Sequence, residues 1–191
     1  FINEIANLCE KTGINVEDVS LGMGSDIRIG SRFLRPGPAY GGSCFPKDTK
    51  GLISIGNKVK INLSVVKSVV KSNENRKRLL LKRIDHIFGK NIKNIKNKKI
   101  VFLGVTFKPN TDDMRDAASL FMIPYLLKKK AVVSYYDPTG EKKEFKKSKS
   151  NDNFSKSTIL KHVRNLYSRQ GLSSKGFTSI GAQHTLLTEF L

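Results

Sequence analysis

The stretch KIVFLGV, residues 99–105, is an apolar run with the length of a buried parallel strand. Residues 116–127 follow with the apolar spacing of a helix, and AVVSYYD, residues 131–137, indicates a second strand. A strand, a helix and a strand of this size form a right-handed βαβ unit. The expected fold class is therefore α/β, with a Rossmann-like parallel sheet in the second half of the chain.

The first half of the chain predicts helices. Apolar residues recur at helical spacing over residues 63–88, while Lys, Arg and Glu occupy the opposite face, so this long helix needs a partner surface. A helix is expected at residues 1–12, with Gly13 as its stop. Another is expected at residues 16–23, with Asn15 as its cap.

Two domains are expected. The polar segment 90–99, rich in Lys and Asn, is the predicted connector between a helical region, residues 1–89, and a Rossmann-like domain, residues 97–191. That domain is expected to be incomplete or altered after about residue 140. Residues 141–181 include a run of Lys, Ser and Asn that by itself is typical of a solvated or disordered segment. Residues 184–190 could form a third strand.

The loop after the first expected strand does not carry the usual dinucleotide pattern. Its sequence, LGVTFKPNTDD at residues 103–113, has a single glycine, whereas the dinucleotide-binding pattern is GxGxxG. The carboxyl end of a parallel strand is nevertheless where open α/β sheets bind ligands. Lys108 lies at this edge and Arg115 opens the next helix. Each is either an ordinary solvent-facing cation or a ligand contact.

Composition excludes several classes of protein. Two cysteines far apart do not make a disulfide framework, no Cys/His cluster has the spacing of metal ligands, and no apolar run approaches the length that spans a bilayer. We therefore expect a cytoplasmic protein with no metal and no membrane partner. The net charge of +19 reflects either a Lys-rich surface or a polyanionic partner. Few aromatic residues interleave with the basic runs, so no nucleic-acid partner is expected.

The most informative segment for chemistry is FLRPGPAYGGSCFPKD, residues 33–48. Gly and Pro residues ahead of Cys44 allow the backbone to press close to a ligand, and a helix is expected to start just after the cysteine. A helix N-terminus and the nearby Lys47 both favour a thiolate, which is how a nucleophile is built. Asp48 could cap the following helix, or could face the thiol and handle a proton or a water.

This segment resembles the active-site loop of the UDP-glucose 6-dehydrogenases, a family of nucleotide-sugar dehydrogenases. The resemblance covers roughly residues 1–140 and includes four further segments: INEIANLCE at 2–10, DIRIG at 26–30, GVTFKP at 104–109 and YDP at 136–138. Sister enzymes that act on UDP-N-acetylmannosamine tend to carry His before the cysteine, and GDP-mannose enzymes tend to carry Leu after it. Ser43 and Phe45 therefore imply UDP-glucose as the substrate.

The resemblance implies an NAD-dependent oxidation of UDP-glucose to UDP-glucuronate in two steps. Cys44 would add to an aldehyde as a thiolate, giving a thiohemiacetal and then a thioester, and Asp48 would assist the proton transfers. Lys47 and Arg115 would contact NAD. The residues that the resemblance places at the sugar nucleotide are Arg28, Phe33, Leu34, Arg35, Pro36, Gly37, Tyr40, Gly41 and Lys108, with Arg28 reaching the site of the neighbouring subunit. The helical region would build a homodimer.

The family's NAD-binding domain, with its Gly-rich loop, would precede Phe1. We therefore expect a fragment, or a decayed enzyme, that does not turn over alone and that depends on a separate or missing N-terminal domain. Three hypotheses follow: the catalytic and UDP-binding part of a dehydrogenase, an inactive nucleotide-sugar-binding or dimerisation module, and a nucleic-acid-binding protein. The intact loop around Cys44 favours the first.

Overall fold

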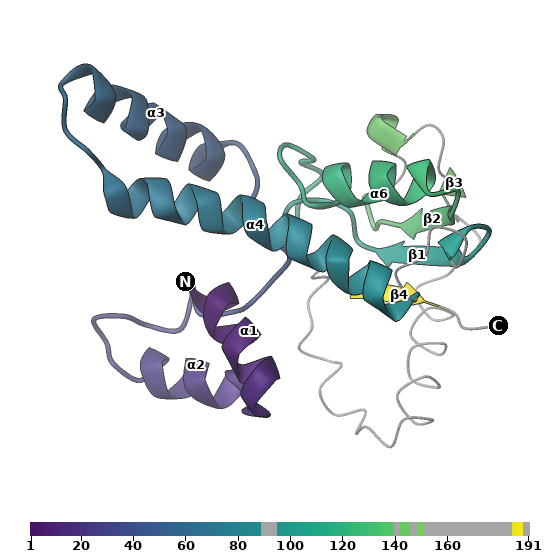
Figure 1. Ribbon diagram of the computed structural model, residues 1–191, viewed down its shortest axis with the longest axis horizontal. Coiled ribbons are helices and arrows are strands. Elements are labelled where there is room, and N and C mark those ends of the chain that lie inside the picture. The colour runs from purple at the N-terminus through teal and green to yellow at the C-terminus, as the bar shows by residue number, and fades with distance from the viewer. Residues whose placement is uncertain (89–94, 140–141, 146–148, 151–184, 189–191) are drawn as a thin grey trace. The chain divides into compact units, whose positions relative to one another are not determined.

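The structure is a computed structural model, which describes residues 1–88, 95–139, 142–145, 149–150 and 185–188 (Figure 1). Its contacts divide the chain into two compact units. The first unit comprises Phe1–Tyr40 and Cys44–Leu80, and the second comprises Gly41–Ser43 and Leu81–Leu191. Residues 90–94 of the predicted connector lie outside the described residues, so the predicted domain bounds stay predictions.

The first unit is helical, as its apolar spacing predicts. Its helices are α1 (Ile2–Thr12), α2 (Val16–Gly24), α3 (Cys44–Lys58) and most of α4 (Ser64–Ile87). Of the helices that the structure describes, none is both long and apolar enough to cross a membrane.

Two predicted helix ends are confirmed. Gly13 follows α1 with φ 73°, a left-handed conformation that glycine adopts without steric cost, and its N–H donates to the carbonyl of Cys9. At the start of α2, the side chain of Asn15 accepts the N–H of Glu17 at 3.0 Å. Local chemistry therefore sets the ends of these helices.

The start of α3 contradicts one of the two hypotheses for Asp48, that it caps this helix. The helix begins at Cys44 itself and not after it, so Asp48 lies inside the second turn, where its side chain cannot serve as the N-cap. The capping hypothesis is therefore wrong. Pro46 is accommodated because the N–H that proline lacks would have no helical partner in a first turn.

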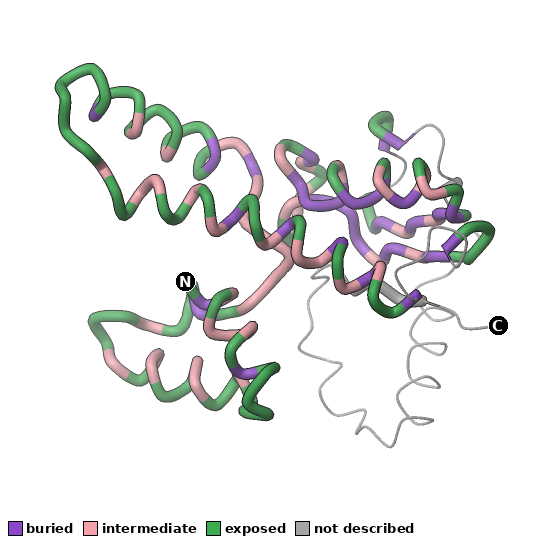
Figure 2. The backbone as a smooth tube through the Cα atoms, viewed as in Figure 1, coloured by how far each residue is buried: buried purple, intermediate pink, exposed green. Residues whose placement is uncertain are grey.

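Burial along α4 changes with position (Figure 2). Val65 and Val69, near its N-terminus, are exposed, whereas Leu81, Ile84 and the following Phe88 are buried. The division between the two units falls inside this helix, after Leu80. Within the described residues, the apolar face predicted over residues 63–88 is therefore buried only toward its C-terminal end.

The second unit contains the predicted βαβ arrangement. It is built from β1 (Lys99–Leu103), α6 (Ser119–Lys128) and β2 (Val132–Tyr136), and β1 pairs with β2 in parallel, Ile100 opposite Val133 and Phe102 opposite Tyr135. The α/β fold class is confirmed. The helix begins at Ser119 and not at residue 116, because Asp116 has φ 54° and breaks the backbone before it.

Two further strands complete a sheet of order β3-β2-β1-β4. The strand considered for residues 184–190 is observed as β4 (Thr185–Thr188), which runs antiparallel to β1. A short strand, β3 (Lys149–Ser150), pairs in parallel with β2. Most of the predicted polar segment 141–181 lies outside the described residues.

The core of the second unit lies between the sheet, α6 and the end of α4. Burial alternates along both parallel strands, with Ile100, Phe102, Val133 and Tyr135 buried. From the helices come the buried side chains of Leu81, Ile84, Met122, Ile123 and Leu126. These side chains account for the apolar face that the sequence predicts for each element.

A polar cluster fastens the end of α4 to α6 within this unit. The hydroxyl of Tyr125 donates to Asp85, and the ammonium of Lys129 lies 2.5 Å from the same carboxylate and 4.6 Å from the Tyr125 ring centroid. Burial raises the pKa of Tyr125, and the hydrogen bond to Asp85 adds to this effect. The last turns of α4 are therefore held by directional contacts as well as by packing.

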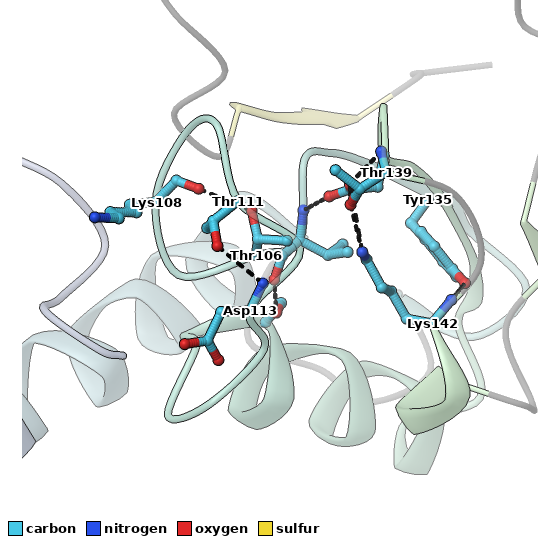
Figure 3. A network of polar contacts seen from close by, with 10 residues as sticks. Thr106, Lys108, Thr111, Asp113, Tyr135, Thr139 and Lys142 are labelled. Carbon is cyan, nitrogen blue, oxygen red and sulfur yellow. Dashed lines mark hydrogen bonds and ion pairs between the residues drawn. The ribbon is translucent and has the colours of Figure 1, made fainter. Parts of the chain in front are cut away.

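Asp137 ties together the two segments that leave β1 and β2. Its carboxylate, with a side chain only 2% exposed, accepts the N–H of Val105 at 3.0 Å and both the N–H and the hydroxyl of Thr139. The ammonium of Lys142, 6% exposed, lies 3.7 Å away and also donates to the Thr139 hydroxyl (Figure 3). The N–H of Lys142 donates to the hydroxyl of Tyr135.

This environment lowers the pKa of Asp137. Burial by itself raises the pKa, but the Thr139 hydroxyl, the N–H groups of Val105 and Thr139 and the charge of Lys142 outweigh it and hold the pKa below its ordinary value of 3.8. Lys142 belongs to the run that is predicted to be solvated. It can be buried because the carboxylate of Asp137 forms an ion pair with its ammonium.

We expect Asp137→Asn to destabilise the second unit by about 3 kcal/mol, because it leaves the buried Lys142 ammonium without a counter-charge. The measurement is urea unfolding followed by hydrogen exchange at the amides of β1 and β2. Asp112→Asn, at an exposed position of the same unit, is the matched control and should change the free energy of unfolding by less than about 0.5 kcal/mol. Equal effects of the two substitutions would contradict this account.

The same carboxylate should make the second unit sensitive to acid. Because its pKa is lower in the folded state, it contributes stability above its unfolded pKa, and this contribution is lost as the pH falls from about 3.8 through the folded pKa. Urea midpoints measured from pH 6 downward should therefore fall more steeply in that window for the natural chain than for Asp137→Asn. Parallel curves for the two proteins would show that Asp137 is not responsible.

Candidate functional site

Cys44, the predicted nucleophile, is the first residue of α3 and is exposed. The N–H groups of a first helical turn have no partner within the helix, and the helix dipole favours negative charge at that end. Cys9, by contrast, is buried on α1, and neither cysteine forms a disulfide. An exposed sulfur at a helix N-terminus is placed to attack an electrophile as a thiolate.

Asp48 and Lys47 lie on α3 near the thiol. Asp48 follows Cys44 by four residues, and residues at this spacing share one face of a helix. Its carboxylate lies 3.4 Å from the ammonium of Lys47, and both side chains are exposed. Asp48 is not the cap of α3, so the other hypothesis is that its carboxylate exchanges a proton beside the thiol. That hypothesis stays a prediction, and the position of Asp48 on the same face of α3 as Cys44 is suitable for it. Lys47 is accessible to an anionic ligand, although its charge is shared with Asp48.

The loop before the cysteine is fastened to two helices of the first unit. The N–H of Gly37 donates to Asn3 Oδ1 of α1 at 2.8 Å, and its carbonyl accepts the guanidinium of Arg76 of α4 at 3.0 Å. Tyr40 is held by Asn73, which accepts its N–H at 2.8 Å and donates to its carbonyl at 3.0 Å. The backbone groups of Gly37, expected to face the sugar nucleotide, thus make contacts with the protein itself.

The side chains of this loop point to different environments. Leu34 is buried, whereas Arg35 is exposed and Pro36 is intermediate. Phe33 is 78% exposed, which is unusual for a large apolar side chain in a segment that is otherwise held in place. The predicted contacts of these residues with a sugar nucleotide stay predictions.

Three aromatic rings gather beside Cys44 in the first unit. The ring of Phe45, the residue after the cysteine, lies 6.5 Å from Phe33 in a stacked arrangement and 5.8 Å from Tyr40 edge to face. We call Phe33, Tyr40 and Phe45 the aromatic cluster. From the sequence, Phe45 is informative only about the substrate, through the resemblance to the family. No spacing pattern in the sequence indicates that its ring contacts those of Phe33 and Tyr40.

Gly41 and Gly42 belong to the second unit, where they require glycine. A Cβ on Gly41 would collide with the carbonyl oxygen of Asp116, and Gly42 has φ 85° in a place where a Cβ would lie 2.6 Å from the ring of Phe107. The N–H of Gly42 donates to the carbonyl of Arg115 at 2.7 Å. The glycines therefore serve close approach to the protein's own segment after β1, whereas the predicted approach of the loop, and of Gly41, to a ligand stays a prediction.

Arg28, predicted to reach a neighbouring subunit, folds back onto its own turn. Its guanidinium is bidentate to Asp26, with a shortest separation of 2.5 Å, and its side chain is 85% exposed. Hydrogen bonds from the side chain and the N–H of Arg28 hold the pKa of Asp26 below its ordinary value. The role of Arg28 across an interface stays a prediction.

Lys108 follows β1, as predicted, whereas Arg115 does not open the next helix, which begins at Ser119. Both side chains are exposed. The carbonyl of Lys108 accepts the hydroxyl of Thr106, which shapes the turn (Figure 3), and its ammonium lies 5.3 Å from the centroid of Phe107. Arg115 is bidentate to Asp113, and these hydrogen bonds lower the pKa of Asp113. The predicted contacts of both cations with a ligand stay predictions.

A cavity of about 520 Å³ lies in the second unit on the side of the strands' carboxyl ends. Its lining brings Arg115 together with residues that sequence reasoning missed: Asp112, Asp113, Met114, Leu120, Thr139, Lys142, Lys143 and Glu144. This is the place where open α/β sheets bind ligands. The lysines were not predicted here because their run of charge indicates a solvated segment.

The residues present fit NAD only in part. The N–H of Val105, where a dinucleotide fingerprint would receive pyrophosphate, already donates to the Asp137 carboxylate. Lys47 in the first unit and Arg115 in the second can each attract a phosphate, although each is in an ion pair. Among the described residues no group of three or more His, Cys, Asp or Glu side chains could hold a metal ion.

Comparison with known proteins identifies the family of both units. Residues 1–75 match the model of the central domain of the UDP-glucose/GDP-mannose dehydrogenase family, and residues 101–168 match the model of its UDP binding domain. The chain is 49% identical over 140 residues to UDP-glucose 6-dehydrogenase of Rhizobium meliloti (strain 1021), and 46% identical over 138 residues to UDP-glucose 6-dehydrogenase YwqF of Bacillus subtilis (strain 168). These alignments cover 73% and 72% of this chain.

Solved structures agree with this family. A UDP-glucose dehydrogenase from the hyperthermophilic archaeon Pyrobaculum islandicum matches 72% of this chain and 31% of its own with a TM-score of 0.66 and 33% identity. An NDP-N-acetyl-D-galactosaminuronic acid dehydrogenase from Methanosarcina mazei Go1 matches 80% of this chain and 34% of its own with a TM-score of 0.63 and 28% identity.

The chain spans about a third of the length of the curated relatives, 31% for the protein of Rhizobium meliloti and 30% for YwqF. The two family models describe different domains of one family and together cover most of the chain. The chain therefore belongs to the UDP-glucose/GDP-mannose dehydrogenase family.

Proposed function

We propose that this chain is the central and UDP-binding part of a UDP-glucose 6-dehydrogenase, which oxidises UDP-glucose to UDP-glucuronate. The observation that carries the proposal is the exposed Cys44 at the N-terminus of α3, inside the segment that matches the family's central domain. The aromatic cluster next to it and Asp48 one turn further along α3 support the same chemistry. The protein would work in the cytoplasm.

NAD, when bound, accepts a hydride in each of the two oxidations that convert the C6 alcohol to an acid. The thiolate of Cys44 attacks the aldehyde carbon, forming a C–S bond while the carbonyl oxygen takes up a proton. Loss of the second hydride from that carbon, with the hydroxyl proton, leaves a thioester. Water then attacks the thioester carbon, the C–S bond breaks, and the acid and the Cys44 thiolate are released.

Asp48 serves the proton steps in this proposal, because a carboxylate one turn from the sulfur can accept a proton from water during hydrolysis of the thioester. Lys47 and Arg115 would attract phosphates of the cofactor. Lys108 and the loop of residues 33–41 would contact UDP-glucose. An NAD-binding domain would be supplied by a further segment or by a separate chain.

We expect UDP-glucose-dependent NADH formation when this chain is mixed with a separately made N-terminal NAD-binding domain of the family. Cys44→Ala should reduce the rate by at least about 10³-fold, because no other described thiol is exposed. Cys9→Ala is the matched control: it removes the buried cysteine of α1 and should leave the rate within about threefold.

Two outcomes would redirect the proposal. NADH formation that survives Cys44→Ala would contradict the assignment of the nucleophile. No activity in the mixture, with UDP-glucose binding still detected by calorimetry, would favour the inactive nucleotide-sugar-binding module.

We also propose that the first unit forms a homodimer through apolar residues of α3 and α4. Leu52, Ile55 and Val59 recur along α3 and just beyond it at helical spacing and are all exposed, as are Val65 and Val69 of α4. Isolated exposed apolar residues are ordinary on a monomer, but a stripe along a helix marks an interface.

We expect Ile55→Lys to weaken the dimer at least about tenfold, because a charge would enter an apolar interface. Sedimentation equilibrium over a range of concentrations measures the dissociation constant. Ser54→Lys adds the same charge at the adjacent exposed position of α3 and should have little effect. If both variants and the natural chain sediment as monomers, the dimer is excluded.

A further inference from the structure

Asn73 of α4 makes an unusual contact with the loop that leads to Cys44. Its side-chain oxygen accepts the N–H of Tyr40 at 2.8 Å, and its side-chain nitrogen donates to the carbonyl of the same residue at 3.0 Å. One amide thus pairs with both polar groups of a single residue, as a neighbouring β-strand would. The pairing specifies where Tyr40 lies and also how its peptide groups are oriented.

Asn73 is also buried, with 8% of its surface exposed. A buried amide without partners is costly, and a buried backbone N–H or carbonyl without partners is costly too. The pairing satisfies all four groups at once. Removing the amide therefore leaves Tyr40 without the two contacts that fix its backbone, while the helix around residue 73 keeps its own hydrogen bonds.

Tyr40 contacts Phe45, the residue that follows the nucleophile, so the position of Tyr40 affects that of Phe45. Its ring lies edge to face against Phe45, at 5.8 Å and 85°, and Phe45 stacks on the exposed Phe33. All three rings and Asn73 belong to the first unit, so this chain of contacts lies within one compact body. A displacement of Tyr40 would release one side of Phe45.

The rest of the loop has a second, separate fastening. Arg76, one turn after Asn73 on α4, donates to the carbonyl of Gly37 at 3.0 Å and to Asn7 of α1 at 2.6 Å. Because this anchor holds the earlier part of the loop, loss of Asn73 should free the part nearest the aromatic cluster without unfolding the whole loop.

We propose that Asn73 is a positioning residue of the substrate site: by holding both peptide groups of Tyr40, it keeps the aromatic cluster beside Cys44 in the arrangement that receives UDP-glucose. It makes no contact with the reacting atoms in this proposal, which rests on the proposed function. Residue 73 then contributes to binding of the sugar nucleotide through Tyr40 and Phe45.

The test uses this chain alone, without a separately made NAD-binding domain. Iodoacetamide alkylates the exposed Cys44, peptide mass spectrometry distinguishes it from the buried Cys9, and added UDP-glucose should slow the reaction by covering the sulfur. The concentration of UDP-glucose that halves the rate is measured for the natural chain, Asn73→Ala and Asn73→Asp. Asn75→Ala, an exposed asparagine two residues along the same helix, is the matched control.

We expect Asn73→Ala to raise the half-protecting concentration about tenfold, as expected for the loss of two hydrogen bonds that orient the site. Asn73→Asp keeps the shape and the acceptor of the Tyr40 N–H but turns a carboxylate oxygen toward the Tyr40 carbonyl, so a rise of at least about tenfold is expected, which tests the contact independently of the alanine variant. Asn75→Ala should match the natural chain. Hydrogen exchange in residues 38–43 should be faster in both Asn73 variants.

The outcomes separate the two proposals. If the natural chain is protected by UDP-glucose and the folded Asn73 variants are protected equally well, Asn73 has only a structural role and this inference is overturned. Unchanged hydrogen exchange in the loop would overturn it as well. If UDP-glucose does not protect even the natural chain, the proposed substrate is wrong, and the inference that rests on it is lost for that reason.

Discussion

The loop that leads to the nucleophile has no regular secondary structure, so those of its backbone polar groups that are withdrawn from water must find partners elsewhere. In the first unit the partners are side chains of α1 and α4, with Asn3 and Arg76 on Gly37 and Asn73 on Tyr40. In the second unit the carbonyl of Arg115 receives the N–H of Gly42. This requirement explains why Asn73, a polar side chain, is buried on α4.

The second unit meets a similar requirement at the carboxyl ends of its parallel strands. In a dinucleotide-binding domain the N–H groups after the first strand receive a pyrophosphate, and an acid after the second receives a ribose. Here the acid after β2, Asp137, turns inward and accepts the N–H of Val105 itself. The carboxylate of Asp137 thus supplies the negative charge that a pyrophosphate would bring to this N–H, and the ammonium of Lys142 balances it. The parallel sheet therefore forms without a dinucleotide fingerprint after β1.

Most elements of both units could be predicted because their signals are local. Gly13 and Asn15 mark helix ends through their own backbone and side-chain chemistry, and the apolar run 99–105 indicates a strand by its length. The errors arose where a distant partner decided the outcome, or where a helix began at a different residue from the one predicted. Lys142 belongs to a run that indicates a solvated segment, yet the carboxylate of Asp137 makes its burial possible. For Asp48, capping failed because the helix starts at Cys44.

The sequence by itself determined the α/β class, the helical first half, the position of Cys44 at a helix start and the family, because periodicity and a long contiguous motif are properties of neighbouring residues. Only the tertiary structure decided that Asn73 holds Tyr40, that Phe45 joins Phe33 to Tyr40, and that Asp137 occupies the N–H of Val105. The residues of the two hydrogen-bonded contacts come together only when distant elements pack, and the three rings meet only in the folded loop. None of these contacts leaves a periodic signal in the chain.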